Sequence, residues 1–547
     1  MPTSEPVVTE PYRPRLHFSP ARNWMNDPNG LLFHDGTYHL FFQHNPGGPE
    51  WGDIAWGHAT SSDLLTWTEH SVAIPATEHE MIFSGSAVVD AANTSGLGAA
   101  GAGSAGTGVA GDGPLVAIYT SAYRDHPVHG DNQAQSVAFS VDGGQTWEKY
   151  AGNPVHDRDR TDYRDPKVFW FGPPEGGHWV MVAVDADASR LVVNVSDDLL
   201  RWRTTSTFES ARLPEMWECP DLFPLVVEGA GVALAGGEGG VRWVLVLSTG
   251  GPGQHYVVGD FDGERFVEDA AVPTGRVDHG ADFYAAASFN GLAGEPGGVG
   301  LTEEPAGRRV LIGWMGQAFR APTSPWQGIM SAPRDLGLRA VGGVPRLVSR
   351  FSPEIGRAER EVAVADGVRV GAAAEVAAGE GAAGEGAAGE GAAEEGAAEE
   401  GAASDGTATV VVGRGGGLQQ RVRARIVPGS ASLAGIRVLV GDACGTRIGY
   451  DRTTGELVLD RSASGVVAHE GFATPRRVPV RLVDGALILD VLTDSMSVEV
   501  LANDGEVVVS ELVFPGSDAV GVEVFAEGGG AVVDVRLADL VPQGLSD

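Results

Sequence analysis

The feature that most constrains the fold is a hairpin-like pattern that recurs between residues 14 and 340. "SSDLLTW" (61–67), "SVDGGQTW" (140–147) and "SDDLLRW" (196–202) each place a Ser and an Asp shortly before a Trp, and "GDFDGERF" (259–266) is a looser relative. Asp and Gly favour a tight turn, and the aromatic side chain packs on the following strand. Such hairpins, repeated through one strand-rich region, indicate one per blade of a β-propeller rather than a sandwich.

The rest of the chain also reads as strands. Short runs rich in Val, Ile, Phe, Tyr and Trp alternate with Gly, Asp, Asn and Pro turns, and hardly any window has a helical period. Residues 341–362 read as a connector, two-residue alternation returns from about 407, and Asn503-Asp504-Gly505 is a hairpin turn signal. At 547 residues the chain is long enough for two domains. The sequence therefore predicts an all-β protein: a propeller at 14–340, a linker at 341–362 and a β-sandwich at 363–547.

Two low-complexity stretches interrupt these domains. Residues 91–114 are rich in Gly, Ala and Ser, and residues 371–406 repeat Ala, Glu and Gly with a single sign of charge. We expect the first to be a flexible loop between strands. The second has no apolar anchors and repels itself, so we expect a disordered insertion in the sandwich domain.

Composition narrows the possible partners. The formal net charge of −35 argues against nucleic acid and anionic membranes, and it fits a neutral ligand. The two cysteines, Cys219 and Cys444, form no disulfide framework, and no histidine cluster suggests a metal, so no cofactor or metal is expected. The N-terminus lacks the pattern of a signal peptide, which predicts a cytoplasmic protein, or a secreted one if a signal peptide had been removed.

Three acidic residues stand in apolar or proline-bounded settings. These are Asp27 in "WMNDPNG", Asp165 in "YRDPKVFWF" and Glu218 in "MWECPDLFPL". A residue before proline is held extended, which fixes the direction of its side chain. The innermost strands of a propeller begin around its axis, so acids from three blades can converge on one pocket. Any one of them alone is better explained as a turn or capping residue.

Paired carboxylates are the groups that glycoside cleavage requires. Glu218 lies between Trp217 and Cys219, an apolar setting that favours a protonated carboxyl, whereas Asn26 and Asn29 offer amides to an ionised Asp27. Aromatic side chains suited to stacking on a sugar are also present, namely Trp24, Trp51 and Trp217.

These residues carry a resemblance to a known family. "WMNDPNG", "FSGSAV" (83–88), "YRDPK" (163–167) and "WECPDLF" (217–223) resemble the signature motifs of glycoside hydrolase family 32, which contains invertases, exo-inulinases and levanases. The resemblance implies a five-bladed propeller followed by a C-terminal β-sandwich. It also implies that Asp27 is the nucleophile, that Glu218 is the general acid and then the base, and that Asp165 holds fructose hydroxyls.

The same resemblance implies the residues of a fructose pocket. The matching substrate-binding positions are Asn26, Gln43, Trp51, Phe83, Ser84, Arg164, Tyr284 and Trp314. Ala318 stands where the family often has a second Trp, which leaves one pocket wall undefined.

The predicted function is that of a retaining, exo-acting β-fructosidase acting on sucrose, fructo-oligosaccharides, inulin or levan. A fructosyltransferase would use the same covalent intermediate and the same acids. A non-catalytic fructan-binding protein needs the aromatics and amides but not all three acids. A sialidase-like propeller is a further alternative, and it would require an arginine cluster to bind a carboxylate ligand. The oligomeric state is left open.

Overall fold

The computed structural model describes residues 10–98, 113–228, 240–250, 253–292, 307–316, 321–371, 400–402 and 407–541. The chain forms two compact units. The first comprises Met1–Glu359, Asp494–Leu512 and Leu540–Asp547, and the second comprises Arg360–Thr493 and Val513–Asp539. Part of the range predicted as the sandwich therefore groups with the first unit.

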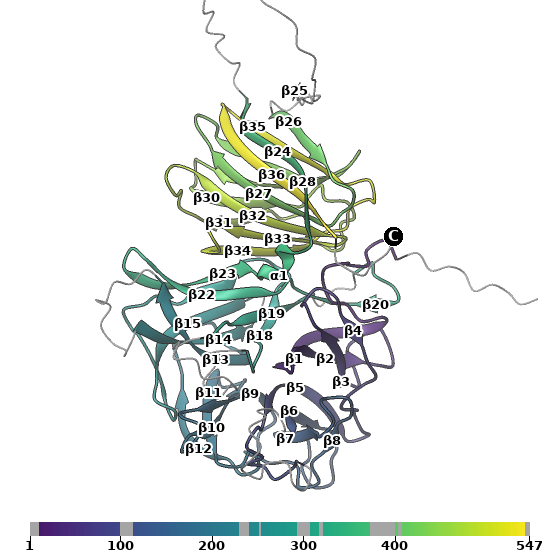
Figure 1. Cartoon of the computed structure of the whole chain (residues 1–547), viewed down its shortest axis with the longest axis vertical. Coiled ribbons are helices and arrows are strands. Elements are labelled where there is room, and N and C mark those ends of the chain that lie inside the picture. Colours follow the sequence, from purple (N-terminus) through teal and green to yellow (C-terminus); the bar gives the residue numbers. More distant parts are fainter. Residues whose placement is uncertain are drawn as a thin grey trace, which may run out of the picture. The chain divides into compact units, whose positions relative to one another are not determined.

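Within the described residues, four mainly antiparallel sheets build the first unit as a propeller, and the ten-stranded one contains two of its five blades (Figure 1). Blade 1 contains β1 (Asn23–His34), β2 (Thr37–Asn45), β3 (Ala55–Ser61) and β4 (Thr68–Glu69), with β20 (Trp326–Gln327) parallel to β1. Blade 2 contains β5 (Glu80–Val89), β6 (Leu115–Tyr123), β7 (Gln133–Ser140) and β8 (Glu148–Lys149). Blade 3 contains β9 (Tyr163–Phe171), β10 (His178–Asp185), β11 (Arg190–Ser196) and β12 (Arg203–Phe208).

The last two blades touch through a short parallel contact between β13 and β22. Blade 4 contains β13 (Trp217–Glu228), β14 (Val241–Thr249), β15 (Gly253–Phe261), β16 (Phe266–Glu268) and β17 (Gly275–Asp278). Blade 5 contains β18 (Tyr284–Ser288), β19 (Val310–Met315), β21 (Ile329–Met330), β22 (Arg334–Val341) and β23 (Val344–Phe351). A short helix α1 (Pro353–Gly356) and the hairpin of β33 (Ser497–Ala502) and β34 (Val507–Leu512) also belong to the first unit.

The first strand of each blade lies at the centre of the propeller. β1 contacts β5, β5 contacts β9, β9 contacts β13, β13 contacts β18, and β18 contacts β1, which closes the ring. The predicted all-β, five-bladed propeller is therefore confirmed.

The hairpin pattern of the sequence marks the outer edge of the blades. In blade 1 the Ser61 hydroxyl accepts the Leu64 N–H (2.8 Å), the Asp63 carboxylate accepts the Thr66 N–H (2.7 Å), and Trp67 donates to the Leu64 carbonyl (3.2 Å). The copy in blade 2 repeats these bonds. The copy in blade 3 repeats the Asp and Trp bonds, while its Ser196 hydroxyl accepts the Asp198 N–H, and the looser copy makes the same Asp turn in blade 4. The local sequence therefore folds as predicted, one hairpin in each of four blades.

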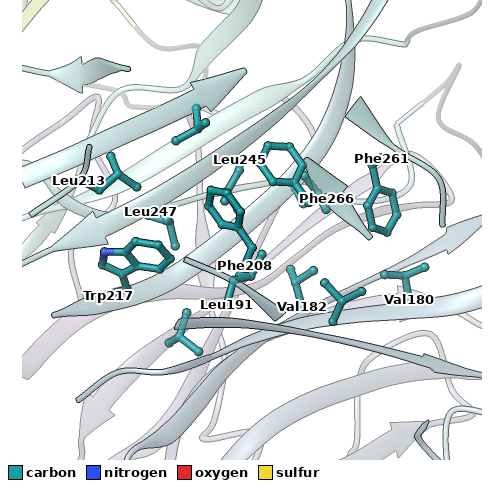
Figure 2. Packing of buried hydrophobic residues seen from close by; sticks show 14 of the residues in the cluster. Val180, Val182, Leu191, Phe208, Leu213, Trp217, Leu245, Leu247, Phe261 and Phe266 are labelled. Carbon is teal, nitrogen blue, oxygen red and sulfur yellow. The ribbon is translucent and has the colours of Figure 1, made fainter. Parts of the chain in front are cut away.

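Apolar side chains from neighbouring blades fill the space between them. Between blades 3 and 4 a cluster includes Val182 and Leu191 from one side and Leu245 and Phe261 from the other (Figure 2). Trp217 is part of this cluster and only 1% exposed. The expectation that Trp217 stacks on a sugar is therefore wrong, because its strand position turns the ring into the core.

The second unit contains two sheets, as expected for a sandwich. One is ordered β24-β36-β27-β32 and the other β25-β26-β35-β28-β29-β30-β31. Their strands are β24 (Glu359–Val370), β25 (Glu400–Ala402), β26 (Thr407–Arg414), β27 (Gln420–Val427), β28 (Leu433–Val440), β29 (Thr446–Asp451), β30 (Glu456–Asp460), β31 (Arg476–Pro479), β32 (Leu487–Asp494), β35 (Gly521–Glu527) and β36 (Ala531–Leu540).

Two expectations about connecting segments need correction. Residues 341–362 are not a plain linker, because β23 pairs with β22 through a turn at Gly342 and Gly343, both with positive φ. Residues 400–402, assigned to the disordered insertion, form β25, which pairs with β26. The remainder of 372–406, most of the 91–114 loop, and Ala318 lie outside the described residues. No helix in the described parts of the chain is long and apolar enough to cross a membrane.

Candidate active site

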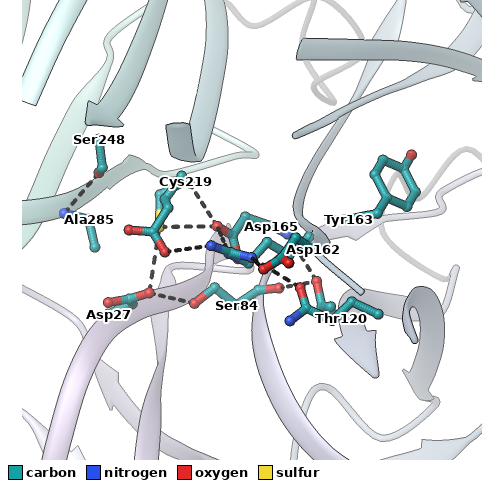
Figure 3. A network of polar contacts seen from close by, with 12 residues as sticks. Asp27, Ser84, Thr120, Asp162, Tyr163, Asp165, Cys219, Ser248 and Ala285 are labelled. Carbon is teal, nitrogen blue, oxygen red and sulfur yellow. Dashed lines mark hydrogen bonds and ion pairs between the residues drawn. The ribbon is translucent and has the colours of Figure 1, made fainter. Parts of the chain in front are cut away.

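Each of the five innermost strands contributes a polar side chain to one site. Asp27 comes from β1, Ser84 from β5, Asp165 from β9, Glu218 from β13 and Tyr284 from β18. The strands begin around the propeller axis, so residues far apart in sequence meet there, as Figure 3 shows for several of them. The three predicted acids therefore lie together.

The backbone is strained at several of these positions. Asp165 (φ 63°), Cys219 (φ 47°) and Ala285 (φ 53°) all adopt left-handed conformations that L-residues rarely take. Hydrogen bonds hold two of them: Asp165 donates its N–H to Thr120 Oγ1 (2.9 Å), and Ala285 donates its N–H to Ser248 Oγ (3.1 Å). Strain of this kind persists where surrounding contacts fix the backbone, and it commonly marks a functional site.

Asp27 is held as a hydrogen-bond acceptor. Ser84 Oγ donates to its Oδ2 (2.6 Å) and Asn26 Nδ2 donates to its Oδ1 (3.0 Å). The Cys219 thiol, whose pKa burial raises well above its usual value, stays protonated and lies 3.5 Å from the same Oδ2. These donors orient the carboxylate and favour its ionised form.

Glu218 is held by a different set of groups. Arg164 Nη2 donates to its Oε1 (3.1 Å) and the Tyr284 hydroxyl donates to its Oε2 (2.7 Å). Burial and the adjacent Glu218 charge raise the pKa of Tyr284, so the phenol keeps its proton. The Glu218 side chain is 29% exposed, which leaves the carboxyl open to the cavity.

Asp165 lies close enough to the other two acids for their charges to act on it. Its Oδ2 accepts the Cys219 N–H (2.9 Å), and Arg164 Nε lies 3.9 Å from the same oxygen. Burial raises the pKa of Asp165 to about 7; Arg164 opposes this rise, and the charges of Glu218 and Asp27 add to it.

The electrostatics of the site follow from three clustered acids, of which Glu218 and Asp165 lie within ion-pair distance of Arg164. Burial is also the main cause that raises the pKa of Asp27, with the Glu218 charge adding to it and the Ser84 and Asn26 hydrogen bonds opposing it. Three ionised carboxylates around Arg164 alone would leave an excess of negative charge in a buried place. The raised pKa values of Asp165 and Asp27 follow from this excess of buried negative charge.

A cavity of about 650 Å³ opens onto two of the three acids, whereas Asp165, Ser84 and Arg164 are not among its lining residues. Asp27 and Glu218 both line it, together with Trp24, Asn26, Pro49, Glu50, Trp51, Tyr284, Trp314 and Gln327. Trp24 and Trp314 pack against each other (ring centroids 6.0 Å apart), and Trp51 is 55% exposed at the mouth. The walls are aromatic and the floor is acidic, which suits a sugar.

Some predicted pocket residues lie behind this wall. Gln43 donates its amide to the Ile82 carbonyl (2.9 Å) and does not line the cavity. Phe83 is also not among the lining residues. Its ring packs edge-on against the ring of Trp51, with the two ring centroids 6.1 Å apart. The roles predicted for the site residues stay predictions.

Sequence reasoning missed the residues that position Arg164. Asp162 Oδ1 accepts from its Nη1 (2.9 Å), as does Gln133 Oε1 (3.3 Å). Asp162 stands two residues before Arg164. Side chains two residues apart in extended chain point to the same face, so this spacing could have indicated the contact from sequence. Gln133 is the first residue of β7 in the neighbouring blade, and no local pattern points to it.

Changing Ser84 to Ala should move the acid limb of the kcat/KM pH profile to higher pH. The Ser84 hydrogen bond lowers the pKa of Asp27, so its loss raises that pKa, and Asp27 becomes protonated at a higher pH than before. The measurement is kcat/KM across an acidic pH series. Ser86→Ala is the matched control, because that hydroxyl donates to the Pro166 carbonyl and does not touch Asp27. An unmoved acid limb in Ser84→Ala would contradict this assignment.

A propeller whose axial cavity holds paired carboxylates under aromatic walls defines a glycoside hydrolase. Two family models match the chain: the glycosyl hydrolases family 32 N-terminal domain over residues 17–349 and the family 32 C-terminal domain over residues 391–539. The chain belongs to glycoside hydrolase family 32.

Individual relatives agree with this assignment. A levanase of Bacillus subtilis (strain 168) is 36% identical over 96% of this chain and 69% of its own length. An extracellular exo-inulinase of Aspergillus awamori is 35% identical over 96% of this chain and 94% of its own. The crystal structure of exo-inulinase from Aspergillus awamori superposes with a TM-score of 0.79, at 33% identity, covering 97% of this chain and 99% of the other. A β-fructofuranosidase from Schwanniomyces occidentalis complexed with fructosyl-erythritol gives a TM-score of 0.76 at 26% identity, covering 98% and 100%.

Proposed function

We propose that this protein is a retaining, exo-acting β-fructosidase that releases terminal β-D-fructofuranosyl residues from sucrose, fructo-oligosaccharides or fructans such as inulin and levan. The observation that carries the proposal is that Asp27 and Glu218 line the same cavity while separate sets of donors hold them. Relatives named levanase and exo-inulinase support the choice of fructosides.

Asp27 acts as the nucleophile in this proposal. Its carboxylate attacks the anomeric carbon of the bound fructosyl residue and forms a covalent glycosyl-enzyme. The hydrogen bonds from Ser84 and Asn26 keep the carboxylate in one rotamer, so little reorganisation is needed for attack.

Glu218 first donates a proton to the leaving oxygen and then takes one from the water that hydrolyses the intermediate. Tyr284 and Arg164 fix the position of its carboxyl group.

Asp165 binds the sugar rather than reacting with it. The Cys219 N–H occupies its Oδ2, which leaves Oδ1 to accept from fructose hydroxyls. Hydrogen bonds of this kind strengthen as positive charge develops on the ring in the transition state.

The test is the release of fructose and glucose from sucrose, together with fructose release from inulin and levan, by the purified chain. Hydrolysis yields equal free glucose and fructose from sucrose and only free fructose as the early product from inulin. An excess of free glucose over fructose would identify a fructosyltransferase instead. Absence of release from all three substrates would overturn the proposal.

A further inference from the structure

The loop between β6 and β7 connects two strands of blade 2 and has a contact near the active site at each end. At its start, Arg124 Nη1 pairs with Asp53 Oδ1 (2.8 Å), two residues after the cavity residue Trp51. Just after it, Gln133 Oε1 accepts from Arg164, which also donates to Glu218. Both ends of the loop are therefore held by residues that belong to the cavity or adjoin it.

This loop carries a cluster of rings and one exposed apolar side chain. Tyr123 stacks on His129 (centroids 4.6 Å, interplanar angle 17°), and His126 lies against both rings, at 4.8 Å from Tyr123 and 4.9 Å from His129. Val128, between the two histidines, is 78% exposed. We call Tyr123, His126, Val128 and His129 the blade-2 platform. None of the four has a role in the hydrolytic mechanism above.

The hydrogen bonds of His126 define its tautomer. Its Nδ1 accepts the backbone N–H groups of Val128 (3.2 Å) and His129 (3.1 Å), so this nitrogen carries no proton. In a neutral imidazole the proton then resides on Nε2, which has no hydrogen-bond partner among the described residues. Partial burial and the neighbouring histidines lower the pKa of His126, in keeping with a neutral ring. The platform therefore offers one N–H donor beside apolar ring faces.

We propose that the blade-2 platform binds fructosyl units of longer fructans outside the catalytic cavity. The proposal rests on the proposed β-fructosidase function and extends it to the part of the substrate beyond the cleaved bond. Ring faces and an exposed valine suit the C–H faces of a sugar, and the His126 donor suits a hydroxyl. Asp125, Asp131 and Asp157 lie in or next to the loop, which disfavours an anionic ligand.

A subsite of this kind acts on long substrates and not on short ones. Sucrose is consumed within the cavity, whereas an inulin chain that leaves the mouth past Trp51 continues over the rim to which Arg124 ties the loop. A second contact on the same chain raises its effective concentration at the cavity, so the platform lowers KM for inulin without changing the chemical step.

The test compares a double variant with a matched control. In His126→Asn the amide oxygen replaces Nδ1 as acceptor for the two backbone N–H groups, which keeps the turn and removes the ring and its Nε2 donor. Combined with Val128→Ser, it removes much of the platform. Val141→Ser is the control, because Val141 is also exposed (59%) and lies in the β7–β8 hairpin of the same blade.

We expect the double variant to lose about fivefold in kcat/KM on inulin, chiefly through KM, while its kcat/KM on sucrose and its thermal midpoint stay at the wild-type values. The control should match wild type on both substrates. Equal losses on sucrose and inulin would mean that the loop only supports the cavity, and unchanged inulin kinetics would mean that the substrate does not touch it; either result overturns the platform. A wild type inactive on both sugars would instead overturn the proposed function.

Discussion

Asp27→Asn should lower kcat for fructose release by on the order of 10⁴-fold or more, with the chain still folded. The amide is close in size to the carboxylate and can still accept a hydrogen bond from Ser84. It has no negative charge with which to attack the anomeric carbon. The measurement is single-turnover and steady-state hydrolysis of sucrose, with circular dichroism and thermal midpoint as the check on folding.

The Glu218→Gln variant distinguishes the general acid from the nucleophile, because only the effect of losing the general acid depends on how readily the leaving group departs. On sucrose this variant should lose about 10²- to 10⁴-fold, since a general acid supplies that much. On an aryl β-fructoside whose phenol leaves without protonation, formation of the covalent intermediate should be largely restored, and azide should speed the return of free enzyme. Asp27→Asn should stay inactive on both substrates. If Asp27→Asn keeps more than about one hundredth of wild-type kcat, another group is the nucleophile.

The sequence predicts well those structural features that a short segment of the chain determines by itself. The Ser-Asp-Trp hairpins close through hydrogen bonds within a few residues, as in Ser61–Trp67, so their fold follows from local chemistry. Asp27, Asp165 and Glu218 each lie near the start of an inner strand, so a propeller topology is enough to bring them together. The expectation that proline holds the preceding residue extended is wrong for Asp165, whose backbone is left-handed (φ 63°).

What the sequence does not predict depends on contacts between blades. Gln133 accepts a hydrogen bond from Arg164, which is 31 residues away in sequence, and Tyr284 donates one to Glu218, which is 66 residues away. Of Gln133 and Tyr284, only Tyr284 was predicted as a site residue, through the family resemblance. Trp217 looked equivalent to Trp51 in sequence, yet one ring is buried between blades and the other is exposed at the mouth. Strand alternation alone does not settle which face of an inner strand meets the cavity, because β13 changes register beside Glu218.

A second large effect is expected at a buried charge cluster in the first unit. His17 Nδ1 lies 2.8 Å from Asp494 and its Nε2 lies 2.7 Å from Glu499, with all three side chains fully buried. Arg334 also binds Glu499, and it pairs with Asp278 at 2.8 Å. The cluster joins the segment before β1 to the β33–β34 hairpin and to blade 5, so it fastens parts of the chain that are distant in sequence.

The protonation of His17 links this cluster to pH. Burial alone lowers the pKa of His17, but the hydrogen bonds and charges of Asp494 and Glu499 outweigh burial and raise it from 6.5 to about 9. Because the folded pKa lies above the unfolded one, the stabilisation is fully present below pH 6.5 and is lost as the pH rises through about 9. A rise of this size corresponds to about 3 kcal/mol of stability at neutral pH.

His17→Ala should therefore destabilise the first unit by about 3–5 kcal/mol at pH 6, because it leaves two buried carboxylates without their shared cation. The effect should shrink between pH 7 and 10, where the wild type itself loses the His17 proton. Urea unfolding followed by tryptophan fluorescence at several pH values measures both. Adding Asp494→Asn should restore part of the loss at pH 6, since one of the two negative charges that His17 balanced is then gone. A destabilisation that is constant from pH 6 to 10 would mean that packing of the ring, rather than its charge, joins these segments.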